Sequence, residues 1–322
     1  MLKNIRNDLK RNFAVASKLT RKPAIIPALF RNYFRLMILR KKVLRNLQLA
    51  ILYDCNYKCP LCATKHLKKA GPPLDIKQIS RLVKEAKDLG CININLTGGE
   101  PLLHPELEQI IRIISENGLM TGLITNGHLL EYNLLKRLKT SGLTELAISV
   151  HGNEAYHDNF TGIKLSYRKA VESIEMAKDN KMSIVINTVI THDNLNSHCI
   201  DDIKRLARHY NIFIQPILIC FPNKDLINSS SVLDKEDLRN FEILLKDPFI
   251  KPLHRNYFGS FCPAGDEYIY IGAYGDVFMC DLLQIPFGNI IDEPLANIWQ
   301  RMLDKRKHIG YGHICVGLGD NS

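Results

Sequence analysis

The 322-residue chain has no apolar run long enough to span a bilayer, because charged residues interrupt every such stretch before the ~18 to 20 residues that a transmembrane helix needs. Residues near the N-terminus do not predict a secretory signal, since Lys and Arg break up the apolar residues and no small-residue cleavage site follows them. Internal repeats and low-complexity tracts are missing as well. We therefore expect a folded cytoplasmic protein with one large domain and an appendage, or with two domains.

Acidic residues are almost absent from residues 1–48, which carry thirteen Lys and Arg but only Asp8 as an acid. The formal net charge of +10 is therefore concentrated in this segment, and the rest of the chain is close to neutral. Such a distribution argues against a uniformly basic surface, so no nucleic-acid partner is expected. It predicts instead a cationic N-terminal arm attached to a catalytic or binding body.

Residues 26–47 of this arm combine an aromatic and aliphatic stripe at helical spacing with interspersed arginines and lysines. Two interpretations remain open. The segment is either an interfacial helix on anionic lipid, which would place the protein at the inner face of the membrane and favour a lipid-linked substrate, or a helix packed across the bottom of the fold with its arginines in water.

Complete disulfide pairing is impossible because the chain has nine cysteines. Three of them, Cys55, Cys59 and Cys62, fall within eight residues. In a reducing compartment, cysteines clustered in this way more often bind metal than form bridges. Cys91 and Cys199 lie within a predicted strand and a predicted helix, where a structural role is expected.

After the arm, short β-branched runs alternate with longer amphipathic stretches. We predict strands over 47–53, 91–96, 121–125, 145–150, 183–190 and 213–218, and helices over 75–89, 106–117, 131–141, 165–179 and 197–209, with Asp75 and Ser166 as caps at or near helix starts. Six βα units of this length predict an α/β fold with a parallel sheet, doubly wound or curled into a partial barrel. Function is then expected beyond the carboxyl ends of the strands.

The C-terminal third has a different pattern and predicts a separate small unit. A polar stretch after residue 220 leads into a short helical segment over 234–246. Residues 267–272 and 276–280 flank Ala273-Tyr274-Gly275 and predict a β-hairpin, and residues 295–308 predict a terminal helix. The expected domains are an arm over 1–46, a core over 47–220, a linker with a helix over 221–260 and a C-terminal domain over 261–322.

The motif Cys55-Asn-Tyr-Lys-Cys59-Pro-Leu-Cys62 supplies three thiols from one loop directly after the first predicted strand. A tetrahedral zinc site would need a fourth local ligand, and the nearby His66 lacks zinc-finger spacing. Three thiolates on a [4Fe–4S] cluster would instead leave one iron without a protein ligand. From the cysteines alone, an iron–sulfur cluster, a zinc site and incidental thiols all remain possible.

The same cysteine spacing followed by Gly98-Gly99-Glu100-Pro101 after the second strand resembles the radical S-adenosylmethionine (SAM) superfamily. The resemblance implies a partial (β/α)6 TIM-like barrel in which the three cysteines hold a [4Fe–4S] cluster and SAM chelates its fourth iron. It also implies reductive cleavage of SAM to a 5′-deoxyadenosyl radical that abstracts hydrogen from a substrate. A one-electron reductant such as flavodoxin or ferredoxin would be a partner.

The resemblance extends to individual SAM contacts. Gly98 and Gly99 would let the backbone approach the methionine portion, and Glu100 or the carbonyls beside it would receive the methionine ammonium. Ser149 and Asn187 match positions that contact the ribose or carboxylate, and Asn126 is a further candidate. The residue before the third cysteine is often aromatic in this family, whereas here it is Leu61. Tyr57 would substitute for it, or adenine would rest on an aliphatic surface.

Four residues just past the fourth predicted strand lie on the side where substrate would enter: His151, Tyr156, His157 and Asp158. A surface-loop role is the first expectation for each of them taken alone, and His151 is the candidate for a hydrogen bond to substrate or SAM.

Residues near the C-terminus carry a second signature. Cys262-Pro-Ala-Gly, Gly275 and Cys280, followed by Phe287-Gly-Asn-Ile and Ile298-Trp299, resemble the start of a SPASM extension, here in a truncated, twitch-like form. The resemblance implies an auxiliary iron–sulfur cluster on Cys262, Cys280 and Cys315. Its fourth site would be taken by substrate or by one of four side chains: Cys220, His254, His313 or Asp281. The alternative is a degenerate module with buried structural cysteines.

The substrate stays open among peptides, sugars or nucleotides, and lipids. A non-catalytic iron–sulfur electron carrier and a zinc-binding interaction module are the alternatives from other classes.

Overall fold

The computed structural model describes residues 25–67, 71–219, 233–251 and 262–309. Its described strands form a nine-stranded sheet in the order β6-β5-β4-β3-β2-β1-β7-β8-β9. The strands are β1 (Asn46–Ala50), β2 (Asn93–Thr97), β3 (Met120–Thr125), β4 (Glu145–Ser149), β5 (Ser183–Ile190), β6 (Phe213–Leu218), β7 (Tyr268–Ile271), β8 (Asp276–Phe278) and β9 (Pro286–Asn289).

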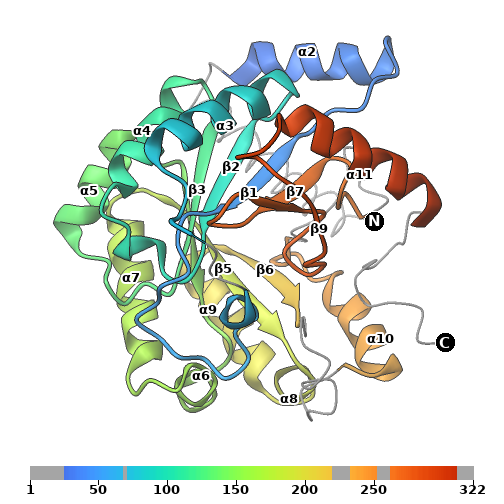
Figure 1. Ribbon diagram of the computed structural model, residues 1–322. Helices are drawn as coiled ribbons and strands as arrows, with labels where there is room; N and C mark the ends of the chain where they lie inside the picture. The colour runs from blue at the N-terminus through green and yellow to red at the C-terminus, as the bar shows by residue number, and fades with distance from the viewer. Residues whose placement is uncertain (1–24, 68–70, 220–232, 252–261, 310–322) are drawn as a thin grey trace.

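Helices connect the strands and cover the outside of the curved sheet (Figure 1). They are α2 (Ile26–Met37), α3 (Ile76–Asp88), α4 (Leu107–Glu116), α5 (Tyr132–Ser141), α6 (Glu154–Thr161), α7 (Ser166–Asp179), α8 (His192–Leu195), α9 (Cys199–Tyr210), α10 (Lys235–Leu244) and α11 (Leu295–Ile309), with short 3₁₀ turns η2 (Ala63–His66) and η3 (Pro101–Leu103). None of the described helices is both long and apolar enough to cross a membrane.

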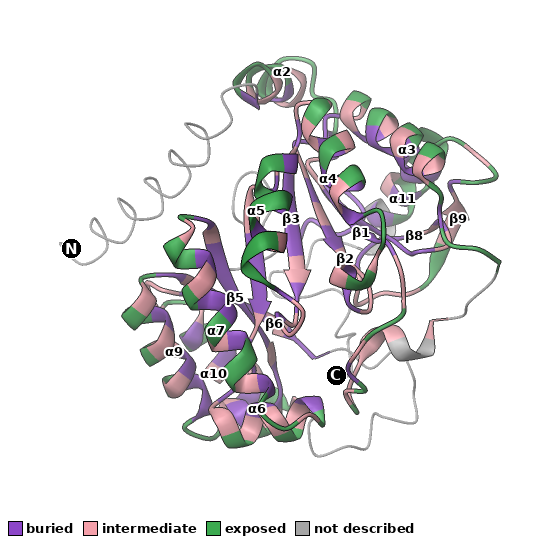
Figure 2. Ribbon diagram, turned by 90° about the vertical axis from the view of Figure 1, so that its left-hand side faces the viewer, coloured by how far each residue is buried: buried purple, intermediate pink, exposed green. Residues whose placement is uncertain are grey.

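Strands β1 to β6 are parallel to their neighbours, as expected for right-handed βα crossovers. Their buried aliphatic side chains, among them Leu47, Leu49, Ile94 and Leu96, pack against the inner faces of the helices and form one continuous core (Figure 2). Each crossover returns the chain to the same end of the sheet, so the carboxyl ends of the six strands meet at one rim. The expected partial (β/α)6 barrel is confirmed.

The C-terminal hairpin continues the core sheet. Strand β7 pairs in parallel with β1, with Asn46 opposite Tyr268 and Leu49 opposite Ile271, and β8 then pairs antiparallel with β7. A third strand, β9, follows the predicted hairpin and pairs antiparallel with β8. The sequence did not predict β9, because its Pro286-Phe-Gly-Asn289 composition disfavours a strand.

The capping residues predicted from the sequence are correct for α3 but not for α7. Asp75 caps α3 in a complete capping box with Gln78, as predicted. Ser166 is not the N-cap of α7, since it is already the first helical residue. The carboxylate of Asp158 accepts hydrogen bonds from the Leu165 and Tyr167 N–H groups instead, and so caps α7 from a position eight residues earlier in the chain.

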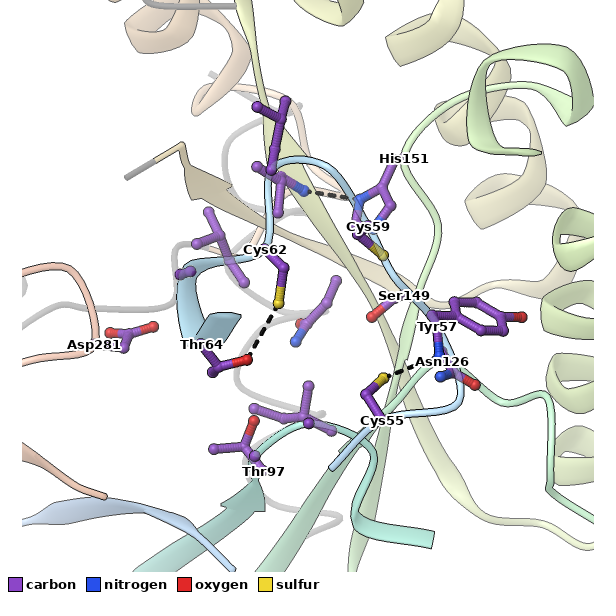
Figure 3. Close-up of a pocket in the computed structure, with 18 of the residues that line it drawn as sticks. Cys55, Tyr57, Cys59, Cys62, Thr64, Thr97, Asn126, Ser149, His151 and Asp281 are labelled. Carbon is purple, nitrogen blue, oxygen red and sulfur yellow. Dashed lines mark hydrogen bonds between the residues drawn. The ribbon is translucent and has the colours of Figure 1, made fainter. Parts of the chain in front are cut away.

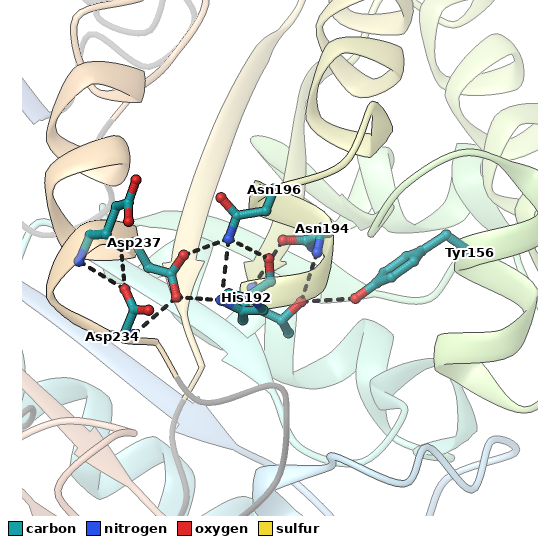
Figure 4. A network of polar contacts seen from close by, with 8 residues as sticks. Tyr156, His192, Asn194, Asn196, Asp234 and Asp237 are labelled. Carbon is teal, nitrogen blue, oxygen red and sulfur yellow. Dashed lines mark hydrogen bonds and ion pairs between the residues drawn. The ribbon is translucent and has the colours of Figure 1, made fainter.

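The linker helix α10 is attached to the barrel through a polar network with α8 (Figure 4). Asp234 caps α10 with a capping box to Asp237. The buried Asp237 carboxylate in turn accepts hydrogen bonds from His192 Nδ1 at 2.8 Å and from Asn196 Nδ2 at 2.6 Å. The hydrogen bond and the negative charge of Asp237 raise the pKa of His192 above its usual 6.5.

This network predicts a pH-dependent contribution to stability. A group whose pKa is higher in the folded than in the unfolded state stabilises the fold when it is protonated. For His192 this contribution is complete below the unfolded pKa of 6.5, and it is lost as the pH rises through the higher pKa of the folded state. The difference in Tm between the native protein and His192→Gln is therefore expected to be largest near about pH 6 and to shrink toward about pH 9. Differential scanning fluorimetry measures it, with His209→Gln on α9 as the control. A difference that is the same at all pH values contradicts the ion pair.

Candidate functional site

A pocket opens at the carboxyl ends of the barrel strands (Figure 3). Its lining combines the loop after β1 with the ends of β2 to β6 and with the hairpin side of the C-terminal unit. Fourteen of the residues singled out from the sequence line this pocket: Cys55, Tyr57, Cys59, Leu61, Cys62, Gly98, Gly99, Glu100, Asn126, Ser149, His151, His157, Asn187 and Asp281. Pro101 is outside the lining and begins η3, where a proline suits the first helical position.

The cysteine loop is held by hydrogen bonds to its own sulfurs. The Tyr57 N–H donates to Cys55 Sγ at 3.3 Å, and Cys62 Sγ lies 3.1 Å from Thr64 Oγ1. The Cys62 N–H donates to the carbonyl of Cys59 at 3.3 Å and so forms a tight turn between the last two cysteines. All three thiols therefore reach the same pocket from one loop.

The spacing of the three sulfurs distinguishes between metal types. Among the described residues, the trio of potential ligand atoms that all lie within 4.8 Å of one another is His192, Asp234 and Asp237, so the three thiols are spread more widely than that. Ligands of one tetrahedral zinc ion would lie about 4 Å apart at Zn–S distances of about 2.3 Å. Thiolates on separate irons of a cuboidal cluster do not need such close convergence, so the loop is compatible with that donor set.

The electrostatics of the three cysteines also favour a positively charged ligand. Burial raises the pKa of Cys59 to about 12, and the neighbouring Cys62 and Cys55 sulfurs add to the rise. Burial likewise raises the pKa of Cys55. Cys55 and Cys59 can both ionise only if a nearby positive charge offsets this cost, and a metal centre supplies such a charge.

The two glycines after β2 are required by the chain itself. A Cβ at Gly98 would lie 2.1 Å from the Leu52 carbonyl oxygen, and a Cβ at Gly99 would lie 2.1 Å from that of Asp54. This close approach allows the Gly99 N–H to donate to Leu52 O and the Glu100 N–H to donate to Asp54 O, both at 2.9 Å. The diglycine turn therefore holds the start of the cysteine loop against the end of β2.

The Glu100 carboxylate is already hydrogen-bonded to other groups of the protein. It is 1% exposed and accepts hydrogen bonds from Thr125 Oγ1 at 2.7 Å, from the Asn126 N–H at 2.9 Å and from the Leu102 N–H at 3.0 Å. Burial raises the pKa of Glu100, while these three hydrogen bonds oppose the rise. Of the two expected ammonium acceptors, the carbonyls of this loop are therefore better available than the Glu100 side chain.

Asn126 and Asn187 differ in how the protein uses them. The Asn126 side chain donates to Asn56 Oδ1 and accepts from the His128 N–H, both at 2.9 Å, so it shapes the loop after β3. Asn187 on β5 is 2% exposed, and neither its Nδ2 nor its Oδ1 has a hydrogen-bond partner among the described residues. A buried amide that lines a pocket with both ends unsatisfied indicates a polar ligand at that position.

His151 and His157 are buried beside the pocket, so the surface-loop expectation for them is wrong. Helix α6 folds back on the end of β4 and encloses both rings, with the Phe160 ring 4.2 Å from that of His151. The Val189 N–H donates to His151 Nδ1 at 3.2 Å, which leaves the proton of a neutral ring on Nε2. Burial keeps the pKa of His151 well below 6.5, so this side chain is a neutral donor at pH 7.

Two other residues of this region have structural partners. The Tyr156 hydroxyl lies 2.8 Å from Thr191 Oγ1, and Asp158 caps α7 as described above. Tyr57 and Leu61 both line the pocket, and the buried Tyr57 hydroxyl lies 3.1 Å from His128 Nδ1. Both expected surfaces for adenine, the tyrosine and the aliphatic side chain, are therefore present at the pocket.

The C-terminal unit contributes to the same pocket. Cys262 and Cys280 are buried in the common core, and the Leu283 N–H donates to Cys280 Sγ at 3.3 Å. Shortly after Cys280, Asp281 and Gln284 line the pocket, and Gln284 Nε2 donates to the carbonyl of Ala63, directly after Cys62, at 3.4 Å. Cys220, His254, His313 and Cys315 lie outside the described residues.

Sequence reasoning missed several lining residues. They are mostly apolar or come from unpredicted elements: Thr64, Phe160, Thr161, Val189, Ile217, Ile219, Tyr270, Leu282 and Gln284. A position just after a predicted strand was an available signal for Ile219, whereas Phe160 belongs to the unpredicted α6. Cys91 and Cys199 are buried as expected, and burial raises the pKa of Cys91 to about 12.

Comparison with known families gives this site its class. The family model of the radical SAM superfamily matches residues 49–207, which include the end of β1, the cysteine loop and β2 to β5. The chain belongs to this superfamily of enzymes, whose cofactors are a [4Fe–4S] cluster and SAM. A second family model, for an iron–sulfur cluster-binding domain of the SPASM type, matches residues 262–313 and implies a further cluster.

Curated relatives are similar over different lengths. The AdoMet-dependent heme synthase of Methanosarcina barkeri is 25% identical over 279 residues, which cover 76% of this chain and 79% of that protein. The PqqA peptide cyclase of Bradyrhizobium diazoefficiens is 28% identical over 161 residues, which cover 49% of this chain and 42% of that protein.

Solved structures share the fold. SuiB of Streptococcus suis superposes with a TM-score of 0.65 at 16% identity, over 80% of this chain and 66% of that one. The enzyme anSMEcpe, solved with bound AdoMet, superposes with a TM-score of 0.62 at 19% identity, over 80% of this chain and 77% of that one.

The hydrogen bonds of Glu100 predict a cost for its removal. Glu100→Ala leaves the buried Thr125 hydroxyl and the Asn126 N–H unpaired, so we expect the free energy of unfolding to fall by about 1–3 kcal/mol. Chemical denaturation measures this loss. The control is Glu106→Ala, because Glu106 is exposed and its side chain caps no N–H group. An equal effect of the two substitutions would contradict the structural role of Glu100.

Proposed function

We propose that Cys55, Cys59 and Cys62 hold three irons of a [4Fe–4S] cluster and leave the fourth iron to the amino and carboxylate groups of SAM. The observation that carries this proposal is the convergence of three thiols and the diglycine turn on one pocket. The zinc-binding alternative would need a fourth local ligand, and the nearby His66 lacks zinc-finger spacing. A non-catalytic electron carrier would not need the unsatisfied Asn187 amide beside the cluster loop.

When bound and reduced by a flavodoxin- or ferredoxin-type partner, the cluster supplies one electron to the SAM sulfonium, which yields methionine and a 5′-deoxyadenosyl radical. The protein then has to orient the substrate and exclude water. Backbone groups of Gly98 to Glu100 receive the methionine portion, and Ser149 and Asn187 bind the ribose or the carboxylate. A radical formed in this way would remove one hydrogen atom from a substrate carbon and leave as 5′-deoxyadenosine.

We also propose that Cys262, Cys280 and Cys315 bind the auxiliary cluster. The Leu283 N–H bond to Cys280 supports this role, because hydrogen bonds to sulfur tune cluster potentials. Asp281 and Gln284 extend from this unit to the pocket, so they would contact a substrate bound there. An auxiliary cluster held by these cysteines would supply an acceptor for the electron that a net oxidation of the substrate releases.

The substrate class rests on weaker support. Relatives named as heme synthases match over most of their length, and relatives named as peptide cyclases match over less than half of theirs. The relatives therefore add a tetrapyrrole to the peptide, sugar or nucleotide, and lipid candidates.

The cluster assignment predicts the iron content of variants. Anaerobic reconstitution is expected to give about eight irons per chain, and replacing Cys55, Cys59 and Cys62 together with Ala to remove about four of them. The protein with the triple substitution should also release no 5′-deoxyadenosine from SAM under reducing conditions. Iron analysis and chromatography of the products provide the measurements.

The buried Cys199→Ala is the matched control for these variants and should keep all the iron. A native, iron-loaded protein that never cleaves SAM would overturn the enzymatic proposal. Retention of all the iron by the triple variant would overturn the ligand assignment.

The unsatisfied amide of Asn187 predicts opposite effects on binding and on stability. Asn187→Leu should weaken SAM binding about tenfold, because a hydrogen bond to the ligand is lost, yet leave the free energy of unfolding unchanged or higher. Thr121→Val is the control, since its buried hydroxyl is also unsatisfied but lies outside the pocket. Isothermal titration and chemical denaturation separate the two effects. If Asn187→Leu destabilises the protein and leaves SAM affinity intact, the amide has only a structural role.

A further inference from the structure

Helix α2 is attached to the barrel along a narrow polar line. Asn32, the one residue of α2 that is fully buried, donates through Nδ2 to the carbonyl of Gly90 at 2.6 Å. Arg31 and Arg35 donate to the carbonyls of Lys87 and Asp88 at 3.3 and 2.9 Å. These carbonyls end α3 and are typical of the groups that a helix C-terminus leaves unsatisfied. The contacts therefore fix which face of α2 turns outward.

The outward face of α2 is aromatic and aliphatic. Phe30 is 72% exposed, Tyr33 60% and Phe34 51%, and the face continues through Met37 and Ile38 at 46% and 65%. Amphipathic helices of soluble domains normally turn such a face toward the core. The expectation of a helix packed on the fold with its arginines in water is wrong, because α2 docks through Asn32, Arg31 and Arg35 and leaves its largest apolar side chains exposed. A contiguous exposed patch of this kind marks an interaction surface.

The charge around the patch indicates the chemistry of its partner. Arg40 and Lys41 follow α2 and are exposed. The preceding residues 1–24 add seven Lys and Arg against Asp8 alone. A second copy of the chain would bring the same positive charges face to face, so self-association is disfavoured. An anionic lipid surface matches both the cationic flanks and the aromatic face.

We propose that α2 is an interfacial anchor that lies on an anionic lipid bilayer with Phe30, Tyr33 and Phe34 in the headgroup region. Aromatic rings are well suited to that depth, since they combine an apolar body with a polarisable edge. The Arg31, Arg35 and Asn32 contacts hold the helix at a defined orientation to the barrel.

The position of α2 sets the orientation of the enzyme. The helix docks at the α3–β2 connection, at the amino ends of the strands, whereas the pocket lies at their carboxyl ends (Figures 1 and 3). An enzyme anchored through α2 keeps its pocket at the far end from the bilayer. The anchor therefore does not favour a lipid-linked substrate, in contrast to the expectation from the sequence.

Vesicle co-sedimentation of the full-length, cluster-loaded protein tests the anchor. The protein is expected to sediment with vesicles of mixed phosphatidylcholine and phosphatidylglycerol, more weakly with phosphatidylcholine alone, and less as salt is added. The double substitution Phe30→Ser and Phe34→Ser should lower the affinity at least ~10-fold. The double substitution Arg40→Gln and Lys41→Gln should lower it for the anionic vesicles only.

Tyr132→Ser is the matched control, because this tyrosine is 50% exposed on α5, away from α2. It should sediment like the native protein, and all variants should keep the native iron content, so that misfolding is excluded. Native protein that stays in the supernatant with anionic vesicles overturns the proposal. A dimer in size-exclusion chromatography that the Phe30 and Phe34 substitutions convert to a monomer also overturns it, and assigns the face to a second copy. None of these outcomes bears on SAM cleavage, which is measured separately.

Discussion

The contact between two backbone segments, at the end of β1 and the end of β2, is the constraint on which the site depends. Two consecutive glycines let the chain after β2 come within hydrogen-bonding distance of the Leu52 and Asp54 carbonyls, where any side chain would collide. The next residue, Glu100, extends the connection to β3 through Thr125. The cysteine loop, the diglycine turn and the loop after β3 are in this way joined into one rigid rim, and a rigid rim is what the control of a reactive radical requires.

Much of this rim could be predicted from the sequence because its determinants are local. Cysteine spacing, glycine pairs and strand periodicity are each read within ten residues, and β5 and β6 have the predicted bounds. The misses involve distant partners. Helix α6 is short and encloses His151 and His157 only after the chain folds back. Asp158 caps α7 from eight residues before the helix. Strand β9 forms despite Pro286 because it can hydrogen-bond to β8.

The side chains of the site divide into those that the protein has already engaged and those that it leaves for a ligand. Glu100 and Asn126, both candidates from the motif, are held by neighbouring loops. Asn187 is held by none of the described residues, although it is as deeply buried as Glu100. Sequence patterns cannot make this distinction, because it depends on which donors and acceptors the fold brings within reach. The structure thus changes which candidate residues are available to bind a ligand, although all three lie at the pocket that the sequence predicted.

The pairing of β7 with β1 has a consequence for how the chain is made. These strands are more than 200 residues apart, yet β1 lies between β2 and β7 and is buried on both sides. Until the last part of the polypeptide has left the ribosome, β1 presents an open, apolar edge next to three reactive thiols. Such an intermediate is prone to strand-to-strand aggregation and to premature oxidation, so chaperone protection during synthesis would benefit this protein more than a barrel whose central strands all come from neighbouring sequence.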